Sequence, residues 1–322
     1  MPILVTGAAG FIGHATALRL LDRGEEVVGV DNFNDYYEVP LKRARAATFA
    51  GRRNMRLVEA DVADAEAMAA LIRGERITRV VHLAAQAGVR YSLENPFAYQ
   101  RSNLQGHLSI LEACRHAPGF QHLVYASSSS VYGDRPLGGG GFSEDEPAVQ
   151  PVSLYAATKR AGELMSASYA HLYGLPQSGL RFFTVYGPWG RPDMAYFSFT
   201  RRILAGEPIE IYGEGRMARD FTYIDDIVDG VIGVLDRPPS TEQPARVFNI
   251  GAGRPVELMD MVSTLECALG REAVKVMRPM QPGDVTATFA DISQIKELTG
   301  YGPKVMLEEG LERFVGWYRG LA

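Results

Sequence analysis

A glycine-rich turn between two apolar segments constrains the fold of this chain more than any other feature. Residues 6–13 read Thr-Gly-Ala-Ala-Gly-Phe-Ile-Gly and follow the apolar run 3–5, which predicts a buried strand. Apolar residues then recur at helical spacing from Ile12 to Leu21, and Gly24 stands where a helix would end. A strand, a glycine turn and a helix in this order allow a pyrophosphate to approach the backbone at a helix N-terminus.

An acidic residue strengthens this interpretation. Asp31 follows the second predicted strand, 27–30, at the spacing of about 20 residues that is typical of a ribose-binding carboxylate. A carboxylate there accepts hydrogen bonds from an adenosine ribose and repels a 2′-phosphate, so the sequence predicts NAD rather than NADP. The alternative, that the glycines only form a tight turn, is disfavoured because the strand, the glycine turn, the helix and Asp31 occur together.

Composition and charge exclude several classes of protein. The net charge is −5 without a basic block, which argues against a nucleic-acid partner, and no apolar run reaches the length of a membrane span. The first predicted strand begins almost at Met1, so we expect no signal peptide and a cytoplasmic location. Cys114 and Cys267 lie in apolar helical patterns, which favours buried free thiols over a disulfide or a metal site, and we expect no metal.

Strands and helices alternate through the first half of the chain, which predicts an α/β fold with a doubly wound parallel (Rossmann) sheet. A length of 322 residues favours one large or two interlocked domains. We expect an NAD-binding domain over 1–184 with a return segment at about 220–250. Residues 185–219 and 251–322 would form a smaller C-terminal α/β lobe that binds the substrate.

Tyr155 and Lys159 are candidates for catalysis. They are four residues apart on a predicted helix, so they share one face. A tyrosine with its reference pKa of about 10 is a poor base, and a neighbouring ammonium and a cationic nicotinamide favour the phenolate. A hydroxyl of the serine run 127–130, at the end of a predicted strand, can hydrogen-bond the same substrate oxygen. Alone, a Tyr-x-x-x-Lys pair would indicate only a helix surface.

With these motifs the chain resembles the extended short-chain dehydrogenase/reductase family over nearly its whole length. Within that family it is most similar to the UDP-glucuronate 4-epimerases. The segments that carry this similarity are DNFNDYY at 31–37, AGVRYS at 87–92, RFFTVYGPWGRPD at 181–193 and RDFTYIDD at 219–226.

The resemblance implies NAD-dependent 4-epimerisation of UDP-glucuronate, with Ser128 as the hydroxyl partner of Tyr155 and Lys159. In related sugar-nucleotide dehydratases an Asp-Glu pair occupies the positions of Ser129 and Ser130, and in decarboxylases a Glu occupies that of Ser130. Both patterns are missing here, which favours epimerisation. Epimerisation of UDP-glucose and UDP-galactose is the closest alternative, and a non-catalytic dinucleotide-binding protein is a remote one.

Arginines bear on the choice between acidic and neutral sugars. Arg90 and Arg191 follow predicted strands, at the edge where open α/β sheets bind ligands. A guanidinium can bind a carboxylate or a diphosphate through two hydrogen bonds. The resemblance places Arg191, Thr184 and Ser129 near the sugar carboxylate and Arg219 near the diphosphate. For any one arginine, a surface or interdomain salt bridge is the alternative.

The expected site therefore has three parts, of which the first is the catalytic group Ser128, Tyr155 and Lys159. Asp61, at the end of a predicted strand, is expected to face the adenine amino group of the cofactor. Capping the N-terminus of a helix is an equally plausible role for it. For the cofactor we expect Gly7, Gly10, Phe11, Ile12, Gly13, Asp31, Asn32, Asn34, Asp61, Val62, Leu83, Ala84, Ala85, Asn103, Tyr155 and Lys159. For the UDP-sugar we expect Arg90, Ser129, Thr184, Arg191, Arg219 and Asp284.

The resemblance also implies a homodimer that packs two long helices from each subunit, here about 96–116 and 153–173. The apolar stripes of these helices could instead be covered within one chain.

Overall fold

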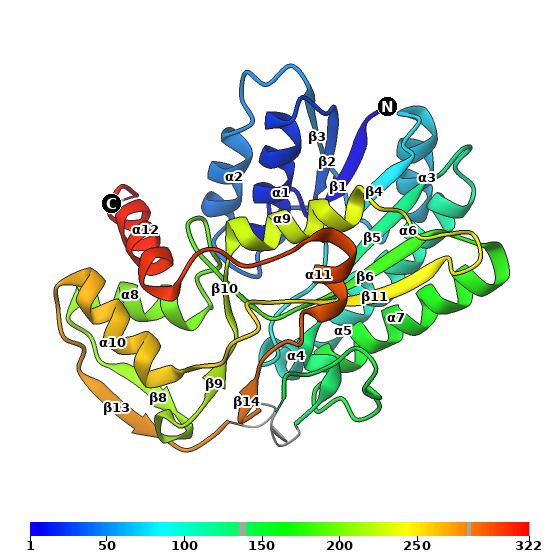
Figure 1. Cartoon of the computed structure of the whole chain (residues 1–322). Coiled ribbons are helices and arrows are strands. Elements are labelled where there is room, and N and C mark those ends of the chain that lie inside the picture. The colour runs from blue at the N-terminus through cyan, green and yellow to red at the C-terminus, as the bar shows by residue number, and fades with distance from the viewer. Residues whose placement is uncertain (135–139, 282–284, 322) are drawn as a thin grey trace.

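A seven-stranded parallel sheet organises the molecule (Figure 1). The computed structural model describes residues 1–134, 140–281 and 285–321. The strand order is β11-β6-β5-β4-β1-β2-β3, so the chain reverses its direction of travel across the sheet between β1 and β4. The strands are β1 (Ile3–Thr6), β2 (Val27–Asp31), β3 (Met55–Glu59), β4 (Arg79–His82), β5 (His122–Ser128), β6 (Gln177–Phe182) and β11 (Ala245–Ile250). This confirms the predicted doubly wound fold, in which ligands bind at the carboxyl ends of the strands beside the reversal.

Helices cover both faces of the sheet because its central strands are apolar on both sides. Ile3 and Val5 of β1 belong to one buried cluster and Leu4 to another, as the two-residue period of a strand requires. On one face α1 packs against α9; on the other α6 packs against α3 and α7. The helices that flank the sheet are α1 (Phe11–Asp22), α2 (Val39–Ala47), α3 (Ala65–Gly74), α6 (Gly106–Arg115), α7 (Leu154–Tyr173) and α9 (Ile224–Leu235).

The long helix expected over 96–116 is composite. It consists of α5 (Pro96–Tyr99), a π-helical turn η1 (Gln100–Gln105) and α6, and the four-residue helix α4 (Tyr91–Glu94) precedes it. Of the two cysteines expected to be buried, Cys114 is buried but Cys267 is exposed, so that prediction was half wrong. The helical period at Cys267 is real, but it places the thiol on the solvent side of its helix.

Shorter elements lie to one side of the sheet, around the lower left of Figure 1. β7 pairs with β10, β8 with β13, and β9 with both β12 and β14. Their bounds are β7 (Thr184–Tyr186), β8 (Ile209–Tyr212), β9 (Ala218–Arg219), β10 (Phe221–Tyr223), β12 (Val256–Glu257), β13 (Lys275–Arg278) and β14 (Ala287–Thr288). The remaining helices are η2 (Ser129–Tyr132), α8 (Ala195–Ala205), η3 (Gly213–Gly215), α10 (Leu258–Leu269), α11 (Ser293–Thr299) and α12 (Leu307–Arg319). Within the described residues, no helix has both the length and the apolar character needed to cross a membrane.

Candidate active site

The glycine turn brings backbone close to backbone at the carboxyl end of β1. Gly7 has a φ of +70°, and a Cβ there would lie 2.9 Å from the backbone nitrogen of Ala84. A Cβ on Gly13 would lie 2.0 Å from the carbonyl oxygen of Gly7. Gly10 precedes α1 and offers no side-chain cap to its first N–H groups. This cradle therefore fits a dinucleotide pyrophosphate, whose oxygens can accept from those groups.

Asp31 ties the glycine turn to the loop after β2. Its side chain is buried and accepts hydrogen bonds from the backbone N–H groups of Ala9, at 3.0 Å, and Phe33, at 2.9 Å. Each carboxylate oxygen carries one of these bonds and keeps a lone pair for a ribose hydroxyl. Asp31 thus holds the loop in place at the position expected for ribose recognition.

Lys42 lies beside this loop, and the sequence analysis missed it. Its ammonium donates to the backbone oxygen of Asn34 at 2.6 Å and to the side-chain oxygen of Asn34 at 2.5 Å. Burial lowers the pKa of Lys42 to about 8, against the attraction of Asp31. A lysine that follows an acidic strand end by eleven positions carries no recognisable signal, because only the turn of the loop brings the two together.

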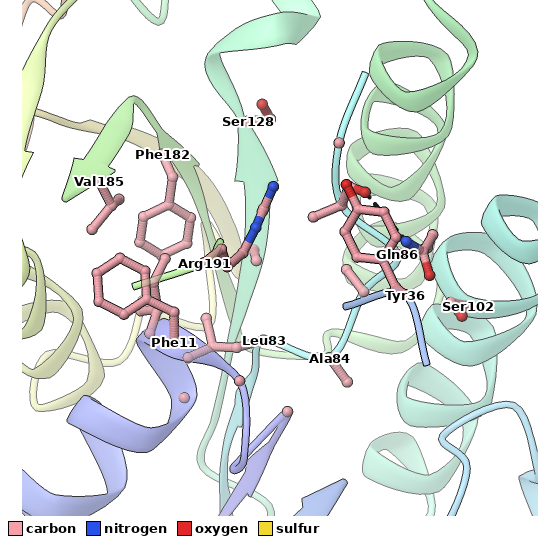
Figure 2. A pocket seen from close by; sticks show the side chains of 18 of the residues that line it. Phe11, Tyr36, Leu83, Ala84, Gln86, Ser102, Ser128, Phe182, Val185 and Arg191 are labelled. Atoms are coloured by element: carbon pink, nitrogen blue, oxygen red, sulfur yellow. Dashed lines mark hydrogen bonds between the residues drawn. The ribbon is translucent and has the colours of Figure 1, made fainter. Parts of the chain in front are cut away.

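A cavity of about 400 Å³ extends from the glycine turn to Arg191 (Figure 2). In the figure Arg191 lies between Phe11 and Leu83 on one side and Tyr36 and Gln86 on the other. Most of the predicted site residues line it: Gly7, Gly10, Phe11, Ile12, Gly13, Asp31, Asn32, Asn34, Val62, Leu83, Ala84, Ala85, Ser128, Ser129, Tyr155, Lys159, Thr184 and Arg191.

Two predicted cofactor residues have partners within the chain. Among the described residues that line the cavity, neither Asp61 nor Asn103 is found. Asp61 accepts from the backbone of Ala63 and pairs with Arg101 at 3.0 Å. Asn103 is buried and donates to the backbone oxygen of Gln86. Asp61 therefore supports the turn after β3, and Asn103 supports the strand end that borders the cavity.

Two predicted substrate residues also lie outside the described lining. The guanidinium of Arg90 lies over the ring of Tyr212, 5.0 Å from its centroid. Arg219 donates to the backbone oxygens of Ala218, at 2.9 Å, and Val285, at 2.8 Å. The sixth predicted substrate residue, Asp284, lies outside the described residues.

The strand end of β5 and the first turns of α7 bring the catalytic candidates together. Ser153 caps α7 by accepting from the backbone of Ala156 at 3.1 Å, which starts the helix just before Tyr155. Lys159 donates to the backbone oxygen of Ala126 at 2.9 Å, one residue before the serine run. Ser128, Tyr155 and Lys159 all line the same cavity.

The electrostatics of this group differ from the expectation. Burial raises the pKa of Tyr155, while the hydroxyl of Ser128 and the charge of Arg191 act in the opposite direction. Burial also lowers the pKa of Lys159 to about 8. In the chain by itself desolvation therefore outweighs the lowering of the Tyr155 pKa that the sequence predicted, and the phenolate depends on charges brought by the ligands.

A buried ion pair fixes the serine strand end against α7. The Ser127 hydroxyl donates to Glu163 at 2.6 Å, and Arg181 donates to both oxygens of Glu163 at 2.8 and 2.9 Å. Glu163 lies one turn beyond Lys159 on α7, while Arg181 belongs to β6. The Glu163–Arg181 pair therefore holds Ser128 and Tyr155 in register. The sequence positions of Glu163 and Arg181 did not reveal this role.

The end of the cavity at Arg191, where the sequence predicts the substrate, is built by side chains from separate segments. Arg191 donates to Asp193 through Nε at 3.0 Å and through one Nη at 2.6 Å, and Tyr36 donates to the same carboxylate at 3.1 Å. Thr184 at the start of β7, together with Ser129 and Ser130, lines the cavity nearby. The sequence analysis predicted Arg191 and Thr184 but missed Asp193 and Tyr36.

A fully buried arginine links the two ends of the cavity. Arg45 donates to the backbone oxygens of Ala9, at 3.0 Å, and Trp189, at 2.7 Å, and to the hydroxyl of Tyr37 at 2.6 Å. Ala9 belongs to the glycine turn, and Trp189, two residues before Arg191, has a φ of +62° that is strained for a side chain of this size. Arg45 thus stabilises both loops at once.

Three comparisons with known proteins bear on the family of this chain. The family model described as the NAD dependent epimerase/dehydratase family matches residues 3–251. The chain is 50% identical to the UDP-glucuronate 4-epimerase 1 of Arabidopsis thaliana over 329 residues, covering 98% of this chain and 76% of that protein.

Solved structures are similar over the whole chain. One is the Bacillus cereus UDP-glucuronic acid 4-epimerase in complex with UDP-glucuronic acid and NAD, with a TM-score of 0.93 and 35% identity, covering 100% of both chains. Another is the UDP-glucose 4-epimerase of Thermotoga maritima with UDP-glucose, with a TM-score of 0.87 and 32% identity, covering 100% of this chain and 99% of that one. The chain therefore belongs to the NAD dependent epimerase/dehydratase family.

Proposed function

We propose that this chain is an NAD-dependent isomerase that converts UDP-glucuronate to UDP-galacturonate by inverting C4. The observation that carries the proposal is the single cavity shared by the glycine turn, the Ser128–Tyr155–Lys159 group and Arg191. A relative named for this activity and a solved structure of such an enzyme with UDP-glucuronic acid and NAD support it.

Within this proposal the chain's own residues move one proton and orient the sugar. Tyr155 takes the proton of the 4-hydroxyl, Ser128 hydrogen-bonds the same oxygen, and Lys159 stabilises the phenolate by its charge. NAD, when bound, accepts the hydride of C4 and returns it, and the residues that line the glycine turn would hold it together with Asp31. The 4-keto sugar then rotates and receives the hydride on its other face, so no net NADH forms.

Arg191, Thr184 and Ser129 are the proposed carboxylate contacts. The oxidised sugar is a β-keto acid, which loses carbon dioxide when the bond to the carboxylate aligns with the carbonyl π system. Charge-assisted hydrogen bonds hold the carboxylate in direction as well as in place, and so can keep this bond near the carbonyl plane. The serines at 129 and 130 provide no carboxylate that would promote elimination or decarboxylation.

Product analysis with UDP-glucuronate and UDP-glucose in separate reactions tests the proposal. We expect UDP-galacturonate from the first and little or no product from the second; a preference for UDP-glucose would instead establish the neutral-sugar epimerase. Arg191→Ala should slow epimerisation and let either a UDP-pentose accumulate, or NADH together with the unreduced 4-keto pentose. Arg216→Ala, which removes an exposed arginine paired with Glu214, is the matched control. Clean epimerisation by Arg191→Ala at the wild-type rate would contradict the carboxylate assignment.

A homodimer is also part of the proposal. Large apolar side chains are exposed along α5, α6 and α7: Phe97 is 79%, Leu108 41%, Leu164 56% and Leu172 62% exposed. A second copy would cover these stripes. Sedimentation as a strict monomer at micromolar concentration would contradict it.

The division into an NAD-binding part, 1–184 with the return at about 220–250, and a substrate lobe, 185–219 and 251–322, remains our proposal. Limited proteolysis with and without NAD tests it by the order in which these segments are cut. The cytoplasm remains our prediction for the location, which cell fractionation tests.

A further inference from the structure

Arg191 already has a carboxylate partner within the chain. Asp193 takes two of its five N–H groups, through Nε and one Nη, at 3.0 and 2.6 Å. This is the bidentate geometry that a substrate carboxylate would itself use. The Arg191 and Asp193 side chains are only 22% and 33% exposed, and Arg191 also lines the cavity.

Tyr36, which also lines the cavity, fixes Asp193. Its hydroxyl donates to the carboxylate at 3.1 Å, and its ring packs against Tyr91 with centroids 4.8 Å apart. A Cβ on Gly88 would lie 2.2 Å from this hydroxyl, so the glycine makes room for it. Asp193 is therefore held both by its own segment and by Tyr36, 157 residues away in the chain, which a mobile surface carboxylate would not be.

Asp193 is negatively charged under ordinary conditions. Burial raises the pKa of its carboxyl, but the charge and hydrogen bonds of Arg191 and the hydroxyl of Tyr36 lower it by more. The pair is therefore electrically neutral, and a sugar carboxylate that reaches Arg191 also meets a negative charge at close range. A neutral sugar, by contrast, meets a guanidinium whose charge is already paired with Asp193.

We propose that Asp193 is a specificity-determining and positioning residue, which weakens the attraction between Arg191 and the sugar carboxylate. This inference rests on the proposed function. Epimerisation requires the 4-keto sugar to rotate between the two hydride transfers, so a carboxylate held by an unopposed arginine would be bound tightly and turn slowly. Asp193 orients the guanidinium and at the same time reduces its net attraction for the acid.

Asp193→Asn separates this role from mere structural support. The amide is nearly isosteric but uncharged, so KM for UDP-glucuronate should fall by on the order of tenfold while kcat also falls, because the sugar is held too firmly. Binding of UDP-glucose should weaken, because Arg191 then faces a neutral sugar without a counter-ion. Loss of a structural support would instead raise KM for both nucleotides.

Two further variants complete the test. Asp193→Glu restores the charge and should return the KM ratio of the two sugars toward the wild-type value. Asp35→Asn removes a carboxylate from the exposed part of the same loop as Tyr36 and should change neither constant. Equal or weaker binding of UDP-glucuronate by Asp193→Asn would overturn the inference.

Binding of both nucleotides to the wild-type holoenzyme, measured by calorimetry, keeps the test independent of whether Asp193→Asn folds. With Asp193 in place the two dissociation constants should lie within about tenfold of each other, and a ratio far above a hundred would overturn the inference. If the wild type epimerises no UDP-glucuronate at all, the proposed function fails, and that result is distinct from both of these.

Discussion

The two ends of the cavity differ in the atoms that build them. One end, at the glycine turn, is the proposed cofactor end, and the other, at Arg191, is the proposed substrate end. The cofactor end is made of backbone: a turn in which Gly7 and Gly13 allow atoms to approach closer than any side chain would permit. The substrate end is made of side chains, Arg191, Asp193 and Tyr36, that come from segments far apart in the sequence. A backbone site is fixed as soon as its strand and helix form, whereas a side-chain site depends on the packing of everything behind it.

This difference predicts how each end responds to mutation. Changes at the cofactor end should alter NAD binding and leave the choice of sugar intact, while changes at the substrate end should alter products and KM. Residues that touch both ends, such as Arg45, should affect both.

Tyr155→Phe should have the largest effect and should separate chemistry from binding at either end. Only the transferable proton and the phenolate charge are lost, so kcat should fall by about 10²–10⁴-fold. NAD content and UDP-glucuronate binding should stay at wild-type levels, as measured by nucleotide release and calorimetry. Tyr173→Phe, at the other end of α7, is the control. If turnover is unchanged, the chain is a dinucleotide-binding protein without this chemistry.

Arg45→Met should break the distinction between the two ends. The substitution removes the donors that serve Ala9 in the glycine turn and the strained Trp189 before Arg191. Each unsatisfied buried carbonyl costs about 1–3 kcal/mol, so NAD affinity and KM for the sugar nucleotide should worsen together. A change confined to one of the two would mean that the loops are held independently.

Asp31→Ala should sharpen the distinction, because Asp31 serves only the cofactor end. Loss of a charged acceptor for the ribose should weaken NAD by on the order of 1–3 kcal/mol. Titration of the nucleotide-free protein with NAD measures this. The preference for UDP-glucuronate over UDP-glucose at saturating NAD should not change, and a shift in that preference would show that the ends are coupled through β2.

A pH effect should arise where the two ends meet. His14 on α1 bonds Thr48 at 2.8 Å and packs against Trp189, and burial, with the charge of Arg45, lowers its pKa to about 3. Because the unfolded state binds more protons than the native state between about pH 6.5 and 3, stability falls as the pH drops through this range.

The burial of this one histidine should lower the free energy of unfolding by about 2 kcal/mol at pH 5, and by close to zero at pH 7. Urea unfolding of wild type and His14→Gln at both pH values measures it, since the other histidines are common to both proteins. His171→Gln, an exposed position on α7, is the control. Equal loss of stability in wild type and His14→Gln would contradict the assignment.

The same contrast explains what the sequence could predict. The glycine turn, Asp31 and the Tyr155–Lys159 pair were found from residue type and spacing, because local geometry defines their roles. The parallel sheet followed from the alternation of strands and helices.

The structure had to supply the rest. Asp193, Tyr36 and Arg45 carry no local signal. Tyr36 and Asp193 are 157 residues apart, and Arg45 and Trp189 are 144 residues apart. Arg191 and Asp193 are near in sequence but become partners only through a tight turn. Asp61 was predicted at the cofactor because it follows a strand, and in the structure its side chain pairs with Arg101. Position at a strand end does not fix the direction of a side chain.

The last strand of the sheet has a consequence for how the protein is made. β11 pairs with β6, but its final residue is synthesised well after that of β6, and α9, which covers α1, lies in between. At typical elongation rates this interval lasts roughly 3 to 14 s. During it β6 is an unprotected edge, open to pairing with a neighbouring nascent chain. Closely spaced ribosomes on one message would therefore bring such edges together, and the yield of folded protein should rise when translation initiates less often.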